Sequence, residues 1–307
     1  MRAPRTLLWN LRRSVSRRRS SGLREAASWA ARSLASLAAF FVLGITSHPA
    51  HGQPPEFTVA FIGDQGLRAE SRAVLSLILA EGAAVVVHSG DFDYIDDPTA
   101  WDQQIDAILG PNFPYFASVG NHDIGMFYGP GGYQEKMVAR MNRLGIPWSG
   151  NLGVQSSLVY QGIHFVLVAP DVNGSGHDTY IRDVFALSPS IWRISSFHKN
   201  MHLMQPEGKG DDTGWGVYEE SRRAGAITAT AHAHAYSRTH LLSSMSQQVI
   251  KTNTNLLELT ADDPVTTEDE GATFAFVSGL GGKSRREQEV WGDWFACIYT
   301  ETQNAQY

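Results

Sequence analysis

The sequence predicts an α/β fold built around a layered sheet. Short apolar runs rich in β-branched residues are typical of strands buried on both faces, and they occupy residues 57–62, 83–88, 114–119, 163–169, 192–197 and 226–231. Segments with the apolar spacing of an amphipathic helix lie between them, at 68–81, 99–109, 133–144 and 213–224. Strands that alternate with helices indicate mainly parallel strands covered by helices.

Each predicted helix ends at a glycine, which can adopt the left-handed conformation that terminates helices. These glycines are Gly82, Gly110, Gly145 and Gly225. Further strands are predicted at 236–242, 249–252, 273–277 and 294–299, with an acidic loop at 262–270. Residues 53–307 contain no long linker and no internal repeat, so we expect one domain there.

The first 52 residues have the features of a signal peptide. They carry nine of the 25 Lys and Arg residues and a single acid, Glu25, ahead of a run of twelve uncharged residues at 34–45. That run is shorter than the roughly 20 residues of a membrane span but matches a signal-peptide core of about 7–15. With Ala50 and Gly52 as small residues for cleavage, we expect an exported protein, periplasmic or secreted, that begins near Gln53. Import into an organelle is the alternative.

The charge of the predicted mature chain excludes some partners. Residues 53–307 contain 25 − 9 = 16 basic and 31 − 1 = 30 acidic side chains, a net charge of −14. A nucleic-acid duplex requires a basic surface, so we do not expect one as the main partner. We expect no stable membrane span after the signal is removed, and the sequence does not indicate an oligomeric state.

Clusters of polar residues directly follow the predicted strands: Asp64, Asp91 with Tyr94, Asn121-His122-Asp123, His198, and His232 with His234. The first three clusters are 27 and 30 residues apart, close to the roughly 30 residues of a βαβ unit. The carboxyl ends of parallel strands meet at one edge of a sheet, so these side chains should converge. Carboxylates and imidazoles together can hold two metal ions about 3.5–4 Å apart around a phosphoryl group.

These motifs resemble those of the calcineurin-like metallophosphoesterases, and Gly-Asp91-Phe-Asp-Tyr94 resembles the purple acid phosphatase branch. The resemblance implies a four-layer α/β/β/α sandwich with mixed sheets over residues 53–307. It implies a first metal bound by Asp64, Tyr94 and His234, a bridging Asp91, and a second metal bound by Asn121, His198 and His232. A phenolate ligand favours Fe³⁺ at the first position, and the second would take a divalent ion, Fe²⁺, Zn²⁺ or Mn²⁺.

The resemblance implies a small phosphorylated substrate and, as activity, the hydrolysis of phosphate monoesters, as in acid phosphatases, by a metal-bound hydroxide. His122 would donate a proton to the leaving oxygen, and Asp123 would orient it. Specificity would reside in loops such as 125–132 and 171–178. The alternatives are a phosphodiesterase acting on nucleotides or phospholipid head groups, and an inactive relative that binds metal and phosphate.

The sequence does not assign a single role to some residues near the motifs. Candidates for contacts with phosphate oxygens or with the ligand loops are Lys199, Asn200 and Arg238. Ala231 stands where the family usually has glycine before the histidine pair, which predicts a less accommodating backbone and lowered activity. Similar proteins continue with another strand beyond the position of Tyr307, so a truncated C-terminus is a further hypothesis.

Overall fold

A computed structural model of the chain describes residues 8–10, 58–263, 265–266 and 269–302. These residues belong to one compact unit. Except for residues 8–10, the predicted signal peptide lies outside the described residues, as does the end of the chain from residue 303. Both predictions therefore stay predictions. Within the described ranges, no helix has the length and hydrophobicity that a membrane crossing requires.

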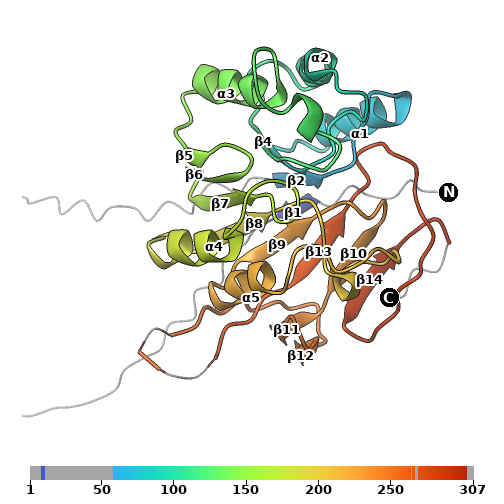
Figure 1. Cartoon of the computed structure of the whole chain (residues 1–307). Coiled ribbons are helices and arrows are strands. Elements are labelled where there is room, and N and C mark those ends of the chain that lie inside the picture. Colours follow the sequence, from blue (N-terminus) through green and yellow to red (C-terminus); the bar gives the residue numbers. More distant parts are fainter. Residues whose placement is uncertain (1–7, 11–57, 264, 267–268, 303–307) are drawn as a thin grey trace, which may run out of the picture. The chain divides into compact units, whose positions relative to one another are not determined.

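The smaller sheet contains four strands in the order β1-β2-β3-β4 (Figure 1). They are β1 (Leu8–Asn10), β2 (Thr58–Ile62), β3 (Val85–Ser89) and β4 (Tyr115–Ser118). β2, β3 and β4 are parallel, while β1 pairs with β2 in the antiparallel direction. All five residues of β3 are buried, as expected for a strand between two covered faces.

The larger sheet has eight strands in the order β14-β10-β13-β9-β8-β7-β6-β5. They are β5 (Ser149–Asn151), β6 (Gln155–Tyr160), β7 (Ile163–Val168), β8 (Trp192–Ser196), β9 (Ile227–Thr230), β10 (Tyr236–Thr239), β13 (Ala275–Ser278) and β14 (Phe295–Tyr299). Its central strands β7, β8, β9 and β13 are parallel, and antiparallel strands flank them on both sides. Both sheets are therefore mixed, as predicted.

Helices cover the outer faces of the two sheets (Figure 1). The helices are α1 (Ala69–Ala80), α2 (Pro98–Ile108), α3 (Tyr133–Leu144), α4 (His177–Ala186) and α5 (Gly216–Arg223). α1, α2 and α3 lie on the side of the smaller sheet, whereas α4 contacts β6 and β7 and α5 contacts β9. The sheets face each other through β3 against β8 and β4 against β7. The order of layers is α/β/β/α, which confirms the predicted fold.

Some elements differ from the prediction. α3 has the predicted bounds, and Gly145 ends it with a φ of 65° in the left-handed region. The expected loop at 171–178 is shorter than predicted, because α4 begins at His177 and buries His177, Ile181 and Phe185 at helical spacing. The expected loop at 125–132 is preceded and partly occupied by a 3₁₀ helix, Ile124–Met126. β5 and β6 were not predicted.

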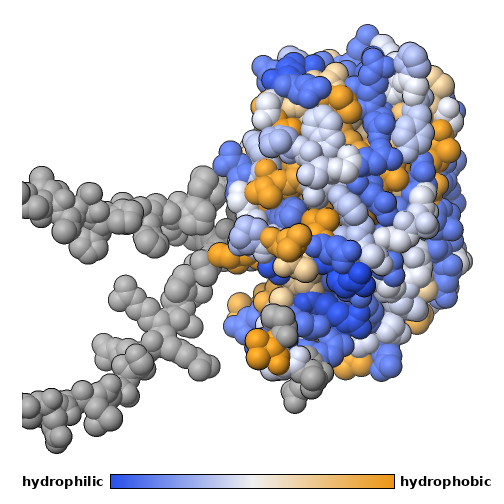
Figure 2. Space-filling model, turned by 60° about the vertical axis from the view of Figure 1, so that its left-hand side comes forward, coloured by the Kyte–Doolittle hydropathy of each residue, from blue (hydrophilic) through white to orange (hydrophobic). Residues whose placement is uncertain are grey.

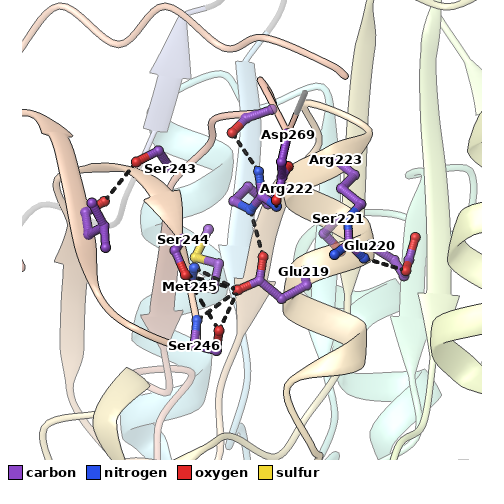
Figure 3. Close-up of polar contacts among 12 residues, drawn as sticks. Glu219, Glu220, Ser221, Arg222, Arg223, Ser243, Ser244, Met245, Ser246 and Asp269 are labelled. Atoms are coloured by element: carbon purple, nitrogen blue, oxygen red, sulfur yellow. Dashed lines mark hydrogen bonds and ion pairs between the residues drawn. The ribbon is translucent and has the colours of Figure 1, made fainter. Parts of the chain in front are cut away.

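A buried arginine fixes α5 to the segments around it (Figure 3). Arg222 is 1% exposed and donates to Glu219, to both carboxylate oxygens of Asp269 and to the carbonyl of Gly271. The other oxygen of Glu219 accepts the backbone N–H groups of Met245 and Ser246, between β11 (Leu241–Ser244) and β12 (Val249–Thr252). These contacts hold the hairpin and residues 269–271 against the helix that supports β9.

The face shown in Figure 2 carries hydrophobic side chains in small separate patches among polar ones. Scattered exposed apolar residues are normal on protein surfaces. This face therefore offers no single extended apolar surface.

Candidate metal centre

The predicted ligands lie just beyond the carboxyl ends of parallel strands in both sheets. Asp64 follows β2, Asp91 follows β3, Asn121 follows β4, His198 follows β8, and His232 follows β9. Because the sheets face each other, residues as far apart in sequence as Asp64 and His232 meet: the backbone N–H of His232 donates to Oδ2 of Asp64 at 2.9 Å. The expected convergence at one edge thus involves two sheets.

One group of ligand atoms comes from Asp64, Tyr94 and His234. The Tyr94 hydroxyl donates to Oδ1 of Asp64 at 2.8 Å and lies 3.2 Å from Nε2 of His234. Nε2 of His234 is 3.4 Å from the same Asp64 oxygen. This is the set predicted for the first metal, and its three ligand atoms face one another.

A second group comes from Asp91, His198 and His232. Nε2 of His198 lies 3.2 Å from Oδ1 of Asp91 and 3.1 Å from Nδ1 of His232. Ligand atoms of the three residues all lie within 4.8 Å of one another, close enough to share one metal ion. The set matches the bridging residue and two of the three ligands predicted for the second metal.

Asn121 and His122 lie at the open side of the site, and both are exposed. The backbone N–H of His122 donates to Oδ1 of Asp91 at 3.0 Å, and its ring lies 4.8 Å from the ring of Tyr94. The side chain of Asn121 forms no hydrogen bond within the described part of the chain, so its ligand role stays a prediction.

Backbone carbonyls fix the orientation of two ligand histidines. Nδ1 of His198 lies 2.7 Å from the oxygen of Ser89, and Nδ1 of His234 lies 2.9 Å from the oxygen of Ser284. A carbonyl oxygen only accepts hydrogen bonds, so each Nδ1 carries a proton, and Nε2 is the nitrogen left to bind a metal. This second contact is typical of metal-binding histidines.

The acids of the site are buried without a lysine or arginine partner. Asp64 is 0% and Asp91 1% exposed, and neither pairs with Lys or Arg among the described residues. A buried carboxylate without a cation is strongly destabilised. Although burial lowers the pKa of His198, the charge of Asp91 and their hydrogen bond outweigh it and raise that pKa to about 9, so a proton takes up the missing positive charge. The donor set therefore fits metal cations.

Tyr94 is held as a phenol in the metal-free site. Burial raises its pKa far above 10, and the charges of Asp64 and Asp91 raise it further. A phenolate at this position requires a strong positive charge beside its oxygen. Lys283, whose Nζ lies 3.9 Å from the ring centroid, is directed at the ring face.

The backbone is strained at the predicted ligands. Asp64, Asp91, Tyr94 and His232 have φ values of 57°, 59°, 65° and 65°, in the left-handed region. Such a conformation in residues other than glycine costs about 1–3 kcal/mol each and clusters at functional sites. Half of the eight described non-glycine residues with positive φ are predicted ligands, which indicates that the strain aims these side chains.

Asp123 joins two ligand loops. Its buried carboxylate accepts backbone N–H groups from Asp91, Phe92 and Gly120 at 2.7–3.0 Å. Burial and the nearby charge of Asp91 raise its pKa to about 8. These contacts hold the loops that carry Asp91 and Asn121, and no described contact joins its carboxylate to the imidazole of His122. The predicted role of Asp123 in orienting His122 therefore stays a prediction. The contacts support a different role, in which Asp123 positions the two ligand loops.

Ala231 fits the site because its neighbour is a glycine. Ala231 is fully buried, and a Cβ added to Gly63 would overlap the Cβ of Ala231. The methyl group thus occupies space that Gly63 leaves free. The two backbones can therefore still approach closely, because Gly63 rather than residue 231 lacks the side chain. Ala231 gives no structural reason for lowered activity.

We expect Gly63→Ala to lower the free energy of unfolding by about 1–3 kcal/mol, the usual range for overpacking a filled interior. Combining it with Ala231→Gly should restore much of the loss, because one methyl group then replaces the other. Urea denaturation of the two single variants and the double variant measures the coupling. Additive effects would show that the two residues do not share this space.

Other residues near the ligands hold their loops. Asn200 is buried, donates to the carbonyl of Ala231 at 2.7 Å and accepts from Tyr218, so it supports the histidine loop. Lys199 pairs with Asp171 at 2.6 Å, and Arg238 donates to Thr239 and Asn255. Of the three candidates, Asn200 is therefore the one that holds a ligand loop.

Sequence reasoning missed three contributors. Glu207 accepts the backbone N–H of His234, and Lys209 donates to the carbonyl of His232. Lys283 donates its backbone N–H to the carbonyl of Asp64 at 2.9 Å. The Gly-rich run 279–282, directly before Lys283, was the one signal in the sequence that this segment approaches the site. A Cβ at Gly279 would lie 2.6 Å from Oδ2 of Asp64, so only glycine fits there.

The family model of the calcineurin-like phosphoesterases matches residues 57–236, more than half of the chain. The chain belongs to the calcineurin-like phosphoesterase family. This confirms the resemblance and, at the level of class, the predicted metallophosphoesterase. Its matched residues include the predicted metal ligands, whereas Lys283 lies beyond them.

Several solved structures are similar to this calcineurin-like phosphoesterase. Purple acid phosphatase PPD1 from yellow lupin (Lupinus luteus) seeds is 18% identical, with a TM-score of 0.53 over 80% of this chain. GAP50, the anchor in the inner membrane complex of Plasmodium, gives 10% identity and a TM-score of 0.47 over 80% of this chain and 78% of its own. PhoD gives 11% identity and a TM-score of 0.43 over 76% and 61%.

The chain spans half the length of the lupin enzyme. At this identity the likeness shows a shared fold. A search of the curated proteins found no match.

Proposed function

We propose that this protein hydrolyses phosphate monoesters at a dinuclear metal centre. One observation carries the proposal: two adjoining groups of ligand atoms each contain a buried carboxylate that pairs with no Lys or Arg among the described residues. These are Asp64 with Tyr94 and His234, and Asp91 with His198 and His232. Family membership supports the reaction class.

Two bound metal ions activate water as a nucleophile near neutral pH and stabilise charge on phosphoryl oxygens. The chain's residues set the geometry around them. Asp91 lies next to both groups, since its Oδ1 is 3.2 Å from Nε2 of His198 and its carboxylate also acts on Tyr94, whose pKa it raises. The carbonyls of Ser89 and Ser284 hold the ligand histidines in the tautomer that presents Nε2.

The donors of the first group favour iron(III). A phenolate is a hard anionic ligand, and the raised pKa of Tyr94 means that only a strongly charged cation would ionise it. Two imidazoles and a carboxylate in the second group suit a divalent ion, Fe²⁺, Zn²⁺ or Mn²⁺. We further propose that the protein acts outside the cytoplasm, on the strength of its N-terminal sequence.

A phosphodiesterase is the second candidate, because the same ligand set can serve a diester. Purified protein loaded with metal and assayed on para-nitrophenyl phosphate and bis-para-nitrophenyl phosphate separates the two activities. We expect faster turnover of the monoester. Faster turnover of the diester would favour the phosphodiesterase, and turnover of neither by metal-loaded protein would favour the inactive binding protein.

We expect His122→Ala to lower kcat by about 10²–10⁴-fold, the usual contribution of general acid catalysis. Its exposed imidazole lies beside Tyr94 and contacts no ligand atom through its side chain, so metal content should not change. Steady-state kinetics and metal analysis of the same preparation measure both quantities. Unchanged turnover would remove the acid role, and loss of metal would show that His122 serves the centre itself.

A further inference from the structure

A pocket of about 470 Å³ lies beside the metal centre. Its lining comes from the start of α1, from the loop after β13 and from β14, and Figure 1 shows that loop passing beside α1. Three basic side chains line it, Arg68, Lys283 and Arg285, with one acid, Glu70. The lining therefore has a net charge of 3 − 1 = +2 in a region of the chain, residues 53–307, whose net charge is −14.

The loop that lines the pocket also holds the metal ligands. Lys283 donates its backbone N–H to Asp64, and its Nζ lies over the ring of Tyr94. The carbonyl of the next residue, Ser284, orients the ring of His234. The pocket and the ligands thus share one segment, and Lys283 both lines the pocket and lies against Tyr94.

The basic side chains have no acidic partner. None of Arg68, Lys283 and Arg285 forms an ion pair with any described residue, although Arg285 donates to the hydroxyl of Tyr299 at 2.6 Å. Arg68 is the N-cap residue of α1 and provides no side-chain cap. A cation at the positive end of a helix dipole is unfavourable, and an anion between the two would reverse that effect.

We propose that this pocket binds a second phosphate group on the substrate whose first phosphate is hydrolysed at the metal centre. The preferred substrates would then be compounds with two phosphate groups close together. In the reaction, water forms a bond to the phosphorus of the group at the metals, the bond from phosphorus to the leaving oxygen breaks, and that oxygen takes a proton. The second phosphate stays on the leaving group. The inference rests on the proposed hydrolase function.

The test compares ADP with AMP, which differ by one phosphate group, in the metal-loaded full chain. The ratio of kcat/KM for ADP to kcat/KM for AMP removes effects common to both substrates. Arg68→Gln and Arg285→Gln should each lower this ratio by about tenfold, the loss expected for one charge-assisted hydrogen bond. Arg72→Gln, at an exposed position one turn further along α1 and outside the lining, is the matched control and should leave the ratio unchanged.

The outcomes separate the two proposals. If the wild type hydrolyses AMP and the ratio falls in Arg68→Gln and Arg285→Gln but not in Arg72→Gln, the second-phosphate pocket is supported. If AMP is hydrolysed but all four proteins share one ratio, the pocket is not a phosphate site and the hydrolase function stands. If metal-loaded protein releases no phosphate from any substrate, including para-nitrophenyl phosphate, the hydrolase function itself fails. Binding of inorganic pyrophosphate, measured by isothermal titration calorimetry and weakened in both pocket variants, would then still reveal the anion site.

Discussion

Asp91→Asn is expected to remove the second metal, weaken binding of the first and lower kcat/KM by at least about 10³-fold, since metal catalysis supplies several kcal/mol. The carboxylate of Asp91 lies within reach of the ligand atoms of both His198 and His232. An amide of the same shape keeps the hydrogen bond from His122 but carries no charge and bridges two cations poorly. Metal analysis and kinetics on one preparation measure the effects.

Asp96→Asn is the matched control for Asp91→Asn. Asp96 lies in the same loop and also has a positive φ, 57°, but its side chain is exposed. Asparagine tolerates this backbone conformation, so metal content and turnover should match the wild type. Retention of two metal ions and near-normal turnover in Asp91→Asn would show that Asp91 is not the bridging ligand.

Much of the fold followed from local pattern. The runs at 83–88 and 226–231 are mainly apolar, and they form β3 and β9 with small shifts at their ends. The ligands Asp91 and His232 could be placed because each comes directly after such a run. What the sequence did not show is that two facing sheets, rather than one, bring them together.

Other features depend on contacts between distant segments. Asp123 joins two loops through backbone N–H groups, a role with no signature beyond an aspartate near a motif. Lys283 reaches Tyr94 across 189 residues of sequence, from a loop in the other sheet. α4 did carry a signal in the spacing of His177, Ile181 and Phe185, but glycines at 174 and 176 favoured a loop.

Tyr94→Phe is expected to abolish the visible absorption of the iron-loaded protein, because that band arises from charge transfer between phenolate and Fe³⁺. The substitution should also change the number of protons released when iron binds. In the metal-free protein the pKa of Tyr94 is raised by burial and then by Asp64 and Asp91, so the phenol is protonated at neutral pH. Binding of Fe³⁺ as a phenolate complex must release that proton. The variant should therefore release one proton fewer on iron binding, which a pH-stat titration measures.

Tyr128→Phe provides the control for Tyr94→Phe, since Tyr128 is half exposed and its hydroxyl accepts hydrogen bonds from Asn151 and Asn173 rather than facing the ligands. Its absorption and proton release should equal those of the wild type. A band that persists in Tyr94→Phe would exclude Tyr94 as a ligand. A wild type that is colourless and active with zinc or manganese alone would remove iron from the proposal and leave hydrolysis in place, because Asp64, Asp91 and the three histidines suit divalent ions without the phenolate.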